Sequence, residues 1–192
     1  MSMLLYIHGF LSSPQSHKAL QVKQWCEIHH PGVEYQCPSL TAYPEESIKT
    51  LEAIVESASG DVALIGSSLG GFYSTFLAEK YNLKAVLINP AVEPHRLMTH
   101  YIHVDLANYH TDQHYRLSEL HIDQLKALDV NPLVKKENYW LMVQTEDETL
   151  DYRAAVKKYK GCRQLVEEGG DHSFQKFERW LPDVFEFLSI TK

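Results

Sequence analysis

The chain has 192 residues, 44% of them hydrophobic, and its 18 basic residues against 25 acidic ones give a formal net charge of −7. This length and apolar content predict one domain over residues 1–192, built on one core. The acidic balance leaves no basic stripe for a nucleic-acid backbone, and no apolar window is long enough for a membrane span, so we expect neither a nucleic-acid partner nor a membrane.

The cysteines and the N-terminal residues indicate the cellular compartment that we expect for this protein. Cys26, Cys37 and Cys162 are odd in number and widely spaced, which fits neither a disulfide framework nor a zinc site and suits a reducing compartment. The chain enters a strand at once, without the basic and apolar regions of a secretory leader. We therefore expect a cytoplasmic protein, and the sequence leaves its oligomeric state open.

Short apolar runs alternate with helical patterns along the chain, which predicts βαβ units and a mostly parallel sheet. The expected strands are Met3–Ile7, Val33–Gln36, Val62–Ile65, Ala85–Ile88, Tyr139–Val143 and Arg163–Val166. The expected helices are His17–His29, Glu45–Ser57, Leu69–Tyr81, Tyr152–Tyr159 and Phe174–Leu188. The fold class is thus α/β, with a six-stranded sheet flanked by helices.

The third strand runs into Gly66-Ser67-Ser68-Leu69-Gly70, the GxSxG pattern of a nucleophile elbow, and a helix follows at once. In this motif a tight strand-to-helix turn exposes the serine hydroxyl, and the flanking glycines avoid a Cβ clash. Ser68 is therefore the candidate nucleophile. An ordinary glycine-rich turn is the less favoured reading.

An attacking serine also needs donors for the oxyanion that forms on the substrate carbonyl. The first strand ends in His8-Gly9-Phe10 and a polar loop, which is the form that the oxyanion loop takes in α/β-hydrolases. We assign the two donors to the backbone N–H groups of Leu69 and Phe10, with Leu11 as the alternative to Phe10. Taken alone, His8-Gly9 would read as a plain turn.

Residues 93–137 interrupt the alternation, and no strand-like run is evident within them. This position carries the cap of α/β-hydrolases, and a small helical cap insertion is predicted here. Its apolar residues are Leu97, Met98, Tyr101, Ile102, Leu106 and Tyr109, followed by a helical pattern over 118–128. Leu97, Met98 and Tyr101 are the candidate substrate contacts, although the packing of the cap itself would need the same side chains.

Six of the eleven histidines lie in this insertion. They are His95, His100, His103, His110, His114 and His121. His110 and His114 are spaced as a metal pair on one helical face could be, but no third ligand or known metal motif accompanies them. Surface histidines are the better interpretation, and no metal or other cofactor is expected.

A serine is a weak nucleophile without a base and an orienting carboxylate, and the C-terminal third supplies both. Gly169-Gly170-Asp171-His172 places His172 on a loop, while Asp147 follows the fifth strand. The order Ser68, Asp147, His172 is that of α/β-hydrolases. Glu148 and Asp151 remain alternatives for the acid, and Asp171 is interpreted as a turn former.

With these motifs the chain resembles the YqiA-type esterases, small bacterial α/β-hydrolases, over essentially its full length. The residues that carry the resemblance are Tyr6 to Phe10, Ser12 to Pro14, Gly66 to Tyr73, Asn89 to Ala91, Asp147-Glu148, Leu150 to Tyr152 and Gly169 to Phe174, whereas Glu146 stands where that family tends to have glycine. The resemblance implies hydrolysis of carboxylic esters or thioesters by Ser68, Asp147 and His172. Since the first strand already ends in the oxyanion loop, which follows the third strand of the full eight-stranded sheet, we expect a minimal version of the fold.

The sequence therefore predicts a serine esterase that acts on a small-molecule ester or thioester through an acyl-enzyme. One alternative is an acyl-CoA thioesterase, whose anionic substrate would ask for a cationic rim; Arg96 and Lys135-Lys136 are its candidates. The other is a catalytically silent binding protein that keeps the fold.

Overall fold

The structure is a computed structural model that describes residues 2–190. Its centre is a sheet of six strands in the order β2-β1-β3-β4-β7-β8, in which every neighbouring pair is parallel. The strands are β1 (Met3–Ile7), β2 (Glu34–Gln36), β3 (Val62–Ser67), β4 (Lys84–Ile88), β7 (Tyr139–Gln144) and β8 (Arg163–Glu167). The mostly parallel six-stranded sheet predicted from the sequence is confirmed.

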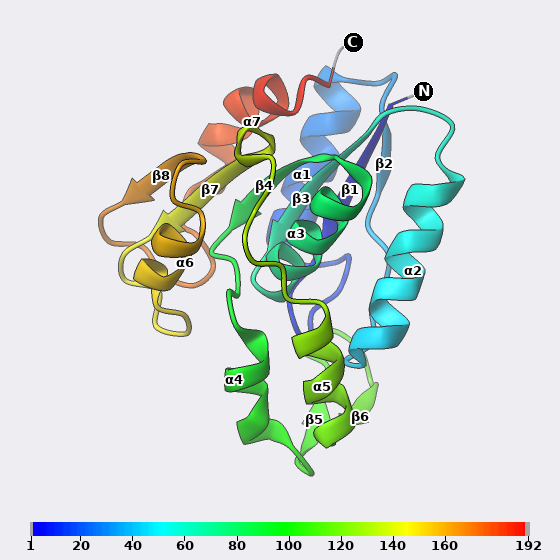
Figure 1. The fold of residues 1–192 in the computed structure, drawn as a ribbon. Coiled ribbons are helices and arrows are strands. Elements are labelled where there is room, and N and C mark those ends of the chain that lie inside the picture. Colours follow the sequence, from blue (N-terminus) through cyan, green and yellow to red (C-terminus); the bar gives the residue numbers. More distant parts are fainter. Residues whose placement is uncertain (1, 191–192) are drawn as a thin grey trace.

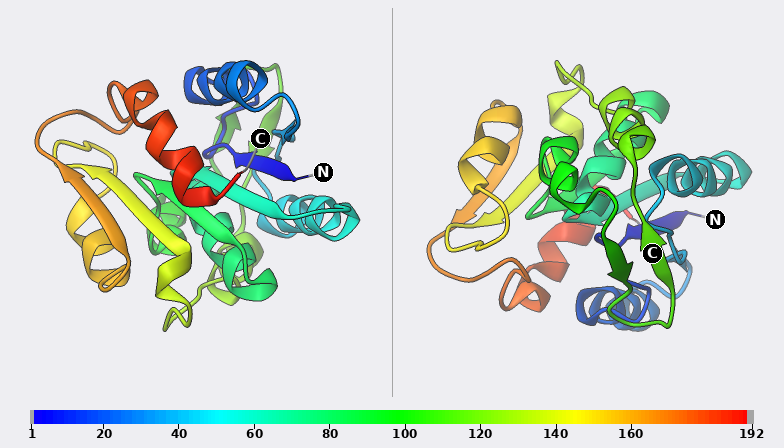
Figure 2. Two further views of the ribbon diagram at one scale, coloured as in Figure 1. Left: turned by 90° about the horizontal axis from the view of Figure 1, so that it is seen from above. Right: turned by 90° about the horizontal axis from the view of Figure 1, so that it is seen from below.

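Helices cover both faces of the sheet, as a parallel sheet requires. They are α1 (His17–His29), α2 (Pro44–Ser57), α3 (Leu69–Tyr81), α6 (Tyr152–Lys158) and α7 (Leu181–Leu188). Helices α1 and α7 lie on one side, and α2, α3 and α6 lie on the other (Figure 2). The four central strands β1, β3, β4 and β7 therefore bury both of their faces, which explains why they read as nearly continuous apolar runs, whereas the edge strands β2 and β8 stay partly exposed.

The core is divided by the sheet into two clusters, because successive side chains of a strand point to opposite faces. In β1, Leu5 and Ile7 pack toward α2 and α3, whereas Leu4 and Tyr6 pack toward α1 and α7. All four are at most 1% exposed.

The C-terminal helix is shorter than predicted. The sequence pattern indicated a helix from Phe174 to Leu188, but Phe174 and Lys176 have φ angles of +59° and +57°, which a right-handed helix cannot contain. A 3₁₀ turn follows at Phe177–Trp180, and α7 begins only at Leu181. Its proline lies in the first turn, where its missing N–H has no consequence.

The insertion over 93–137 has its residues 94–127 at one end of the molecule, and its last segment runs back toward the opposite end, where the chain enters β1 and leaves α7 (Figure 1). Its elements are α4 (Pro94–Met98), a 3₁₀ turn (Thr99–Tyr101), β5 (Asp105–Ala107), β6 (His114–Arg116), α5 (Glu119–Ala127) and a 3₁₀ turn (Lys136–Asn138). Helices α4 and α5 agree with the predicted helical cap.

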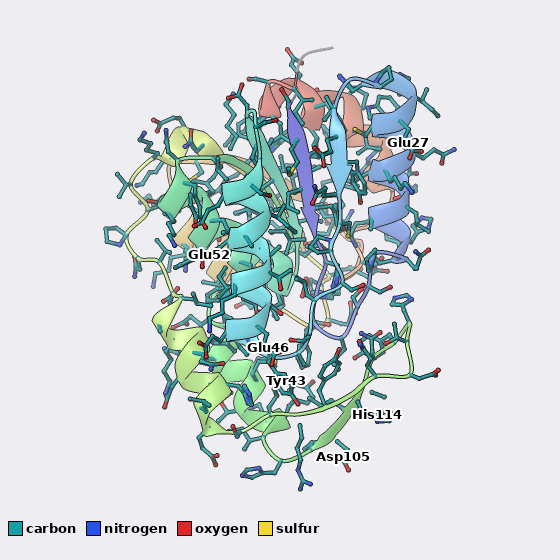
Figure 3. The ribbon with its side chains drawn as sticks, turned by 90° about the vertical axis from the view of Figure 1, so that its right-hand side faces the viewer. Glu27, Tyr43, Glu46, Glu52, Asp105 and His114 are labelled. Carbon is teal, nitrogen blue, oxygen red and sulfur yellow. The ribbon has the colours of Figure 1, made fainter. Side chains whose placement is uncertain are left out.

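The antiparallel hairpin β5-β6 was not predicted, since the sequence showed no strand-like run in this insertion. Each strand has only three residues, and only the central Leu106 and Tyr115, which face each other, are buried. One apolar residue between two exposed ones is too short a pattern to indicate a strand. Figure 3 shows Asp105 and His114 of the hairpin below Tyr43 and Glu46, at the end of α2 nearest the insertion.

Candidate active site

Parallel strands end at one edge of the sheet, and the candidate site is built there. Ile7 of β1 is level with Gly66 of β3, and Ser67 is level with Ile88 of β4. The segments that follow β1, β3, β4 and β7 therefore start side by side. Open α/β sheets bind their ligands at this edge.

Ser68 lies at the turn between β3 and α3 with φ +55° and ψ −120°. A non-glycine residue at positive φ is strained, by about 1–3 kcal/mol, and such strain gathers at functional sites. The turn is fixed from both sides: Ser68 N–H donates to the Ile88 carbonyl at 3.0 Å, and the Ser68 carbonyl accepts from Ala91 N–H at 3.0 Å.

The glycines of the GxSxG pattern are required by space. A Cβ on Gly66 would stand 2.4 Å from the Gly70 carbonyl oxygen, and a Cβ on Gly70 would stand 1.9 Å from the carbonyl oxygen of Ile7. Neither backbone oxygen can move without breaking the turn or β1. Any larger residue at either position would displace Ser68.

The three residues that the sequence singled out are in hydrogen-bond contact. Ser68 Oγ is 3.0 Å from His172 Nε2, and His172 Nδ1 is 2.9 Å and 3.0 Å from the two carboxylate oxygens of Asp147. The Asp147 side chain is only 2% exposed and that of His172 is 24% exposed. The carboxylate can hold the ring with Nδ1 protonated, which leaves Nε2 free to accept the serine proton.

The structure gives the other acidic residues near this strand end different contacts. Glu148 accepts the backbone N–H of His172 at 3.0 Å. Asp151 is the N-cap of α6 and accepts the Arg153 N–H at 3.0 Å. Asp171 accepts the Ser173 N–H within its own turn at 2.9 Å, and its bonds with Ser173 and Gln175 hold its pKa below the usual range.

Two buried amides fix the loop that carries His172. Asn89 Nδ2 donates to the carbonyls of Asp171 and His172 at 3.0 and 3.1 Å, and its Oδ1 accepts the Gln144 N–H at 3.0 Å. Gln144 Oε1 accepts backbone N–H groups from Asp171 and Gln175. Asn89 entered the sequence analysis only through the family resemblance, and Gln144 did not enter it. The sequence signal that could have found both residues is a polar side chain at the end of an apolar strand, as for Gln144, or directly after one, as for Asn89.

The predicted oxyanion loop lies against Ser68. A Cβ on Gly9 would stand 3.2 Å from Ser68 Cβ, so the chain at Gly9 and Phe10 passes directly beside the serine. Leu69 is the first residue of α3, where a backbone N–H has no partner within the helix. Both assigned donors, on Phe10 and Leu69, therefore belong to segments that border Ser68.

The insertion holds the loop after β1 through two hydrogen bonds. Asn108 Nδ2 donates to the Ser12 carbonyl at 3.0 Å, and Tyr109 N–H donates to the Leu11 carbonyl at 2.9 Å. Asn108 Oδ1 also accepts from the backbone of His110 and Thr111 within the hairpin loop. No sequence pattern indicated a role for Asn108, because its partner is 96 residues away.

A cavity of about 410 Å³ opens over Ser68 and His172. The three candidate cap residues, Leu97, Met98 and Tyr101, line it, together with Pro94 and Tyr109 of the same insertion. Ile102 and Leu106 are not among the lining residues and pack into the core on the α2 and α3 side. The apolar residues of the insertion are thus divided between the cavity and the core.

Lys18, in the first turn of α1, lines the same cavity and was missed by the sequence analysis. Its ammonium group donates to the Ser173 carbonyl. Burial lowers the pKa of Lys18 to about 8, against the raising effect of the Asp171 and Asp147 carboxylates. The sequence did contain a signal for Lys18, because a cation is disfavoured at the positive N-terminal end of a helix.

The histidines of the insertion do not form a helical pair. His114 is in β6 and His110 is in the loop before it, so the helical spacing considered for them does not apply. His95 and His121 are half-buried, and the other four are exposed. In residues 2–190, no three His, Cys, Asp or Glu side chains gather as they would around a metal ion. In the same residues, no helix is both long and apolar enough to cross a membrane.

Comparison with solved structures identifies the fold class as α/β-hydrolase. Est1E from Butyrivibrio proteoclasticus superposes with a TM-score of 0.71 at 15% identity, covering 98% of this chain and 87% of that one. The mouse alpha/beta hydrolase domain-containing protein 10 gives a TM-score of 0.75 at 16% identity, covering 97% and 89%. At such identities the likeness shows the fold alone.

The sequence itself matches a narrower group. Residues 3–189 match the model of the uncharacterised protein family UPF0227, and the chain belongs to that family. A UPF0227 protein of Vibrio parahaemolyticus is 23% identical over 193 residues, which cover 96% of this chain and 98% of the relative.

Proposed function

We propose that this protein is a serine hydrolase that cleaves carboxylic esters. The observation that supports it most strongly is the continuous contact from Ser68 Oγ through the His172 ring to the buried Asp147 carboxylate, at 3.0 and 2.9 Å. In α/β-hydrolases this constellation carries out acyl transfer. The resemblance of the sequence to the YqiA-type esterases implies the same activity.

In the proposed reaction, His172 Nε2 takes the Ser68 proton as Oγ attacks the ester carbonyl. The N–H groups of Leu69 and Phe10 receive the negative charge on the carbonyl oxygen. His172 then gives its proton to the leaving alcohol oxygen, which departs and leaves the acyl group on Ser68. Water, deprotonated by the same ring, attacks the acyl carbon, and His172 returns that proton to Ser68 Oγ as the acid is released. Asp147 stabilises the imidazolium in both halves.

The substrate is a small molecule with an apolar acyl group, because Leu97, Met98 and Tyr101 form an apolar part of the cavity wall. The cations first considered for a thioester substrate do not support that choice. Arg96 pairs with Glu93 at 3.0 Å, and the Lys136 side chain lies beside Gly161. Lys135, the third of these cations, does not line the cavity, and neither do Arg96 and Lys136. Cytoplasmic location, suggested by the cysteine pattern, remains part of this proposal.

The test is covalent labelling of the intact chain with a fluorophosphonate, followed by peptide mapping. The adduct is expected on Ser68, and Ser68→Ala should abolish labelling and lower kcat for p-nitrophenyl butyrate by roughly 10⁴- to 10⁶-fold. Ser57→Ala, at the exposed end of α2, is the matched control and should retain both. An adduct on Ser67, or hydrolysis by folded Ser68→Ala at the wild-type rate, contradicts the proposal. No hydrolysis and no labelling of wild-type protein would favour the silent binding protein instead.

A further inference from the structure

One charged group in the cavity has no part in the mechanism above. Lys18 extends from the first turn of α1 into the space over Ser68 and His172. Among the described residues that line this cavity, it is the only lysine or arginine. Apart from Lys18, the acidic and basic side chains of the described wall are Glu148, whose carboxylate accepts the His172 backbone N–H, and His172 itself, so a cation beside Ser68 calls for an explanation.

The charge of Lys18 is not neutralised by a close partner. Across residues 2–190, no carboxylate oxygen lies within 4.0 Å of its nitrogen in an ion pair, whereas Lys158 and Lys80 both have such pairs. The two carboxylates that attract it from farther away are occupied: Asp147 holds His172, and Asp171 holds Ser173. A half-buried charge without a close counter-charge is costly, and such a group in a cavity is a candidate for binding an anionic ligand.

Stability of the fold does not explain this lysine either. In the first turn of α1 it adds positive charge to the positive end of the helix dipole, which is unfavourable. Among residues 2–190 its one hydrogen bond goes to a neutral acceptor, the Ser173 carbonyl. An ammonium group has three donors, so two remain available.

The position of Lys18 relative to His172 indicates whether Lys18 would contact the acyl half or the leaving half of the ester substrate. Its acceptor belongs to Ser173, the residue after the general base, so the ammonium lies on the histidine side of Ser68. The leaving oxygen collects its proton from His172 and must lie on that side too. Leu97 and Met98, in contrast, offer the apolar wall that suits the acyl half.

We propose that Lys18 forms a subsite for an anionic oxygen group, such as a carboxylate or phosphate, carried by the leaving half of the substrate. This inference rests on the proposed function, because a leaving half exists only if Ser68 performs acyl transfer. Ser12 and Ser16 line the cavity with Lys18 and offer hydroxyls to the same group. Glu148 also lines it, but its carboxylate is directed to the His172 N–H.

The experiment compares pairs of esters in which one member carries a carboxylate and the other a neutral group at the same position. For the leaving half, the pair is the butyrate ester of 3-hydroxybenzoate and that of 3-hydroxybenzamide. For the acyl half, the pair is the 4-nitrophenyl monoester of glutarate and 4-nitrophenyl valerate. The quantity measured is the ratio of kcat/KM for the anionic member to that for the neutral member of each pair.

Wild-type enzyme should prefer the anionic member of the leaving-half pair and show no such preference in the acyl-half pair. Lys18→Met should lower the leaving-half ratio by roughly 10- to 100-fold, the range for a lost hydrogen bond to a charged group. Lys18→Arg keeps the charge and should retain most of the ratio. Lys23→Met, farther along the same helix and exposed, is the matched control and should not change it.

Salt dependence provides a measurement that needs no variant. Raising the salt concentration from 0.02 to 0.5 M should reduce the wild-type leaving-half ratio, because the Debye length falls to roughly 4 Å at the higher value. A ratio near one in wild type, or one that Lys18→Met leaves unchanged, overturns the subsite while the esterase proposal stands. A preference confined to the acyl-half pair overturns the assignment to the leaving half. Failure to hydrolyse any of the four esters overturns both.

Discussion

Asp147 shows how much of this site depends on single residues. Its carboxylate is nearly inaccessible, yet Oδ1 accepts the N–H groups of Thr149 and Leu150 at 2.9 and 2.8 Å in addition to the His172 ring. Such bonds hold the direction of the carboxylate. Ser68 and His172 are likewise fixed, the first by its strained turn and the second by Asn89 and Gln144.

Replacing Asp147 by Asn should lower kcat by up to about 10⁴, because an amide cannot hold His172 in the tautomer that leaves Nε2 free to accept a proton. The measurement is steady-state hydrolysis of p-nitrophenyl butyrate, with circular dichroism to confirm that the variant is folded.

Glu148→Gln and Asp151→Asn are the matched controls, because both acids lie on the same strand-end loop and neither contacts the His172 ring. Each should lose far less activity than Asp147→Asn. A larger loss from Glu148→Gln in a folded protein would show that Asp147 is not the acid.

At the scale of elements, the insertion serves two parts of the site. Its hairpin loop holds the loop after β1, the proposed oxyanion loop, through Asn108 and Tyr109, and α4 with the turn after it forms one wall of the cavity. Tyr43, just before α2, stacks on His121 of α5 with ring centroids 4.7 Å apart and meets the Tyr115 ring edge-on. The insertion is thus packed on the body of the protein as well as on the active-site loops.

Leu97→Trp should change the acyl preference in a graded way. A larger side chain in the cavity wall should spare acetyl esters and reduce kcat/KM for longer acyl chains, by roughly 10- to 200-fold per methylene-scale change in the space available. The measurement is kcat/KM across p-nitrophenyl esters from acetate to decanoate.

His100→Trp provides the control for an added indole, since His100 is exposed and does not line the cavity. It should leave the profile of chain lengths as in wild type. Equal losses for every chain length in Leu97→Trp, with an unchanged melting temperature, would mean that α4 does not border the acyl group.

For the molecule as a whole, His8 contributes to folding stability and also lies in the loop beside the candidate active site. This residue is 3% exposed, and its ring accepts the Leu40 N–H at 3.2 Å while its other nitrogen bonds to the Gly9 carbonyl at 2.9 Å. It thereby ties the end of β1 to the loop between β2 and α2. Burial lowers the pKa of His8, and the nearby His110 acts in the same direction, against the carbonyls of Gly9 and Pro38.

The pH dependence of folding stability follows from the direction of this shift. The folded-state pKa of His8 lies below its unfolded value of 6.5, so the unfolded chain binds the proton first as the pH falls. His8 therefore contributes its full stability above about pH 6.5 and loses it as the pH decreases toward the folded-state pKa. In His8→Gln, the free energy of unfolding measured by urea should fall less steeply from pH 7 to pH 5 than in wild type.

His114→Gln is the control, because His114 is exposed on β6 and should leave the wild-type slope unchanged. Equal slopes for wild type and His8→Gln would show that the buried ring does not titrate in this range.

Local sequence was enough to predict the sheet and the three residues now in contact at its edge. Strands that bury both faces form continuous apolar runs, and a nucleophile elbow requires Gly66 and Gly70 at fixed offsets, because a Cβ at either position would meet backbone. Parallel strands also end at one edge, so the residues that follow them could be placed together without knowing any distance. The C-terminal helix and the hairpin were misjudged, since positive φ at Phe174 and three-residue strands leave little trace in a sequence.

Only the tertiary structure decided the contacts between distant segments. Asn108 reaches Ser12, Asn89 holds the His172 loop and Lys18 enters the cavity, across separations of 96, 83 and 155 residues to their hydrogen-bond partners. It also distinguished Asp147 from Glu148 and Asp151, because only the Asp147 carboxylate contacts the His172 ring. A sequence shows which side chains are available near an edge of the sheet. Their direction and their partners depend on the packing of the whole chain, because each is set by backbone that lies elsewhere in the sequence.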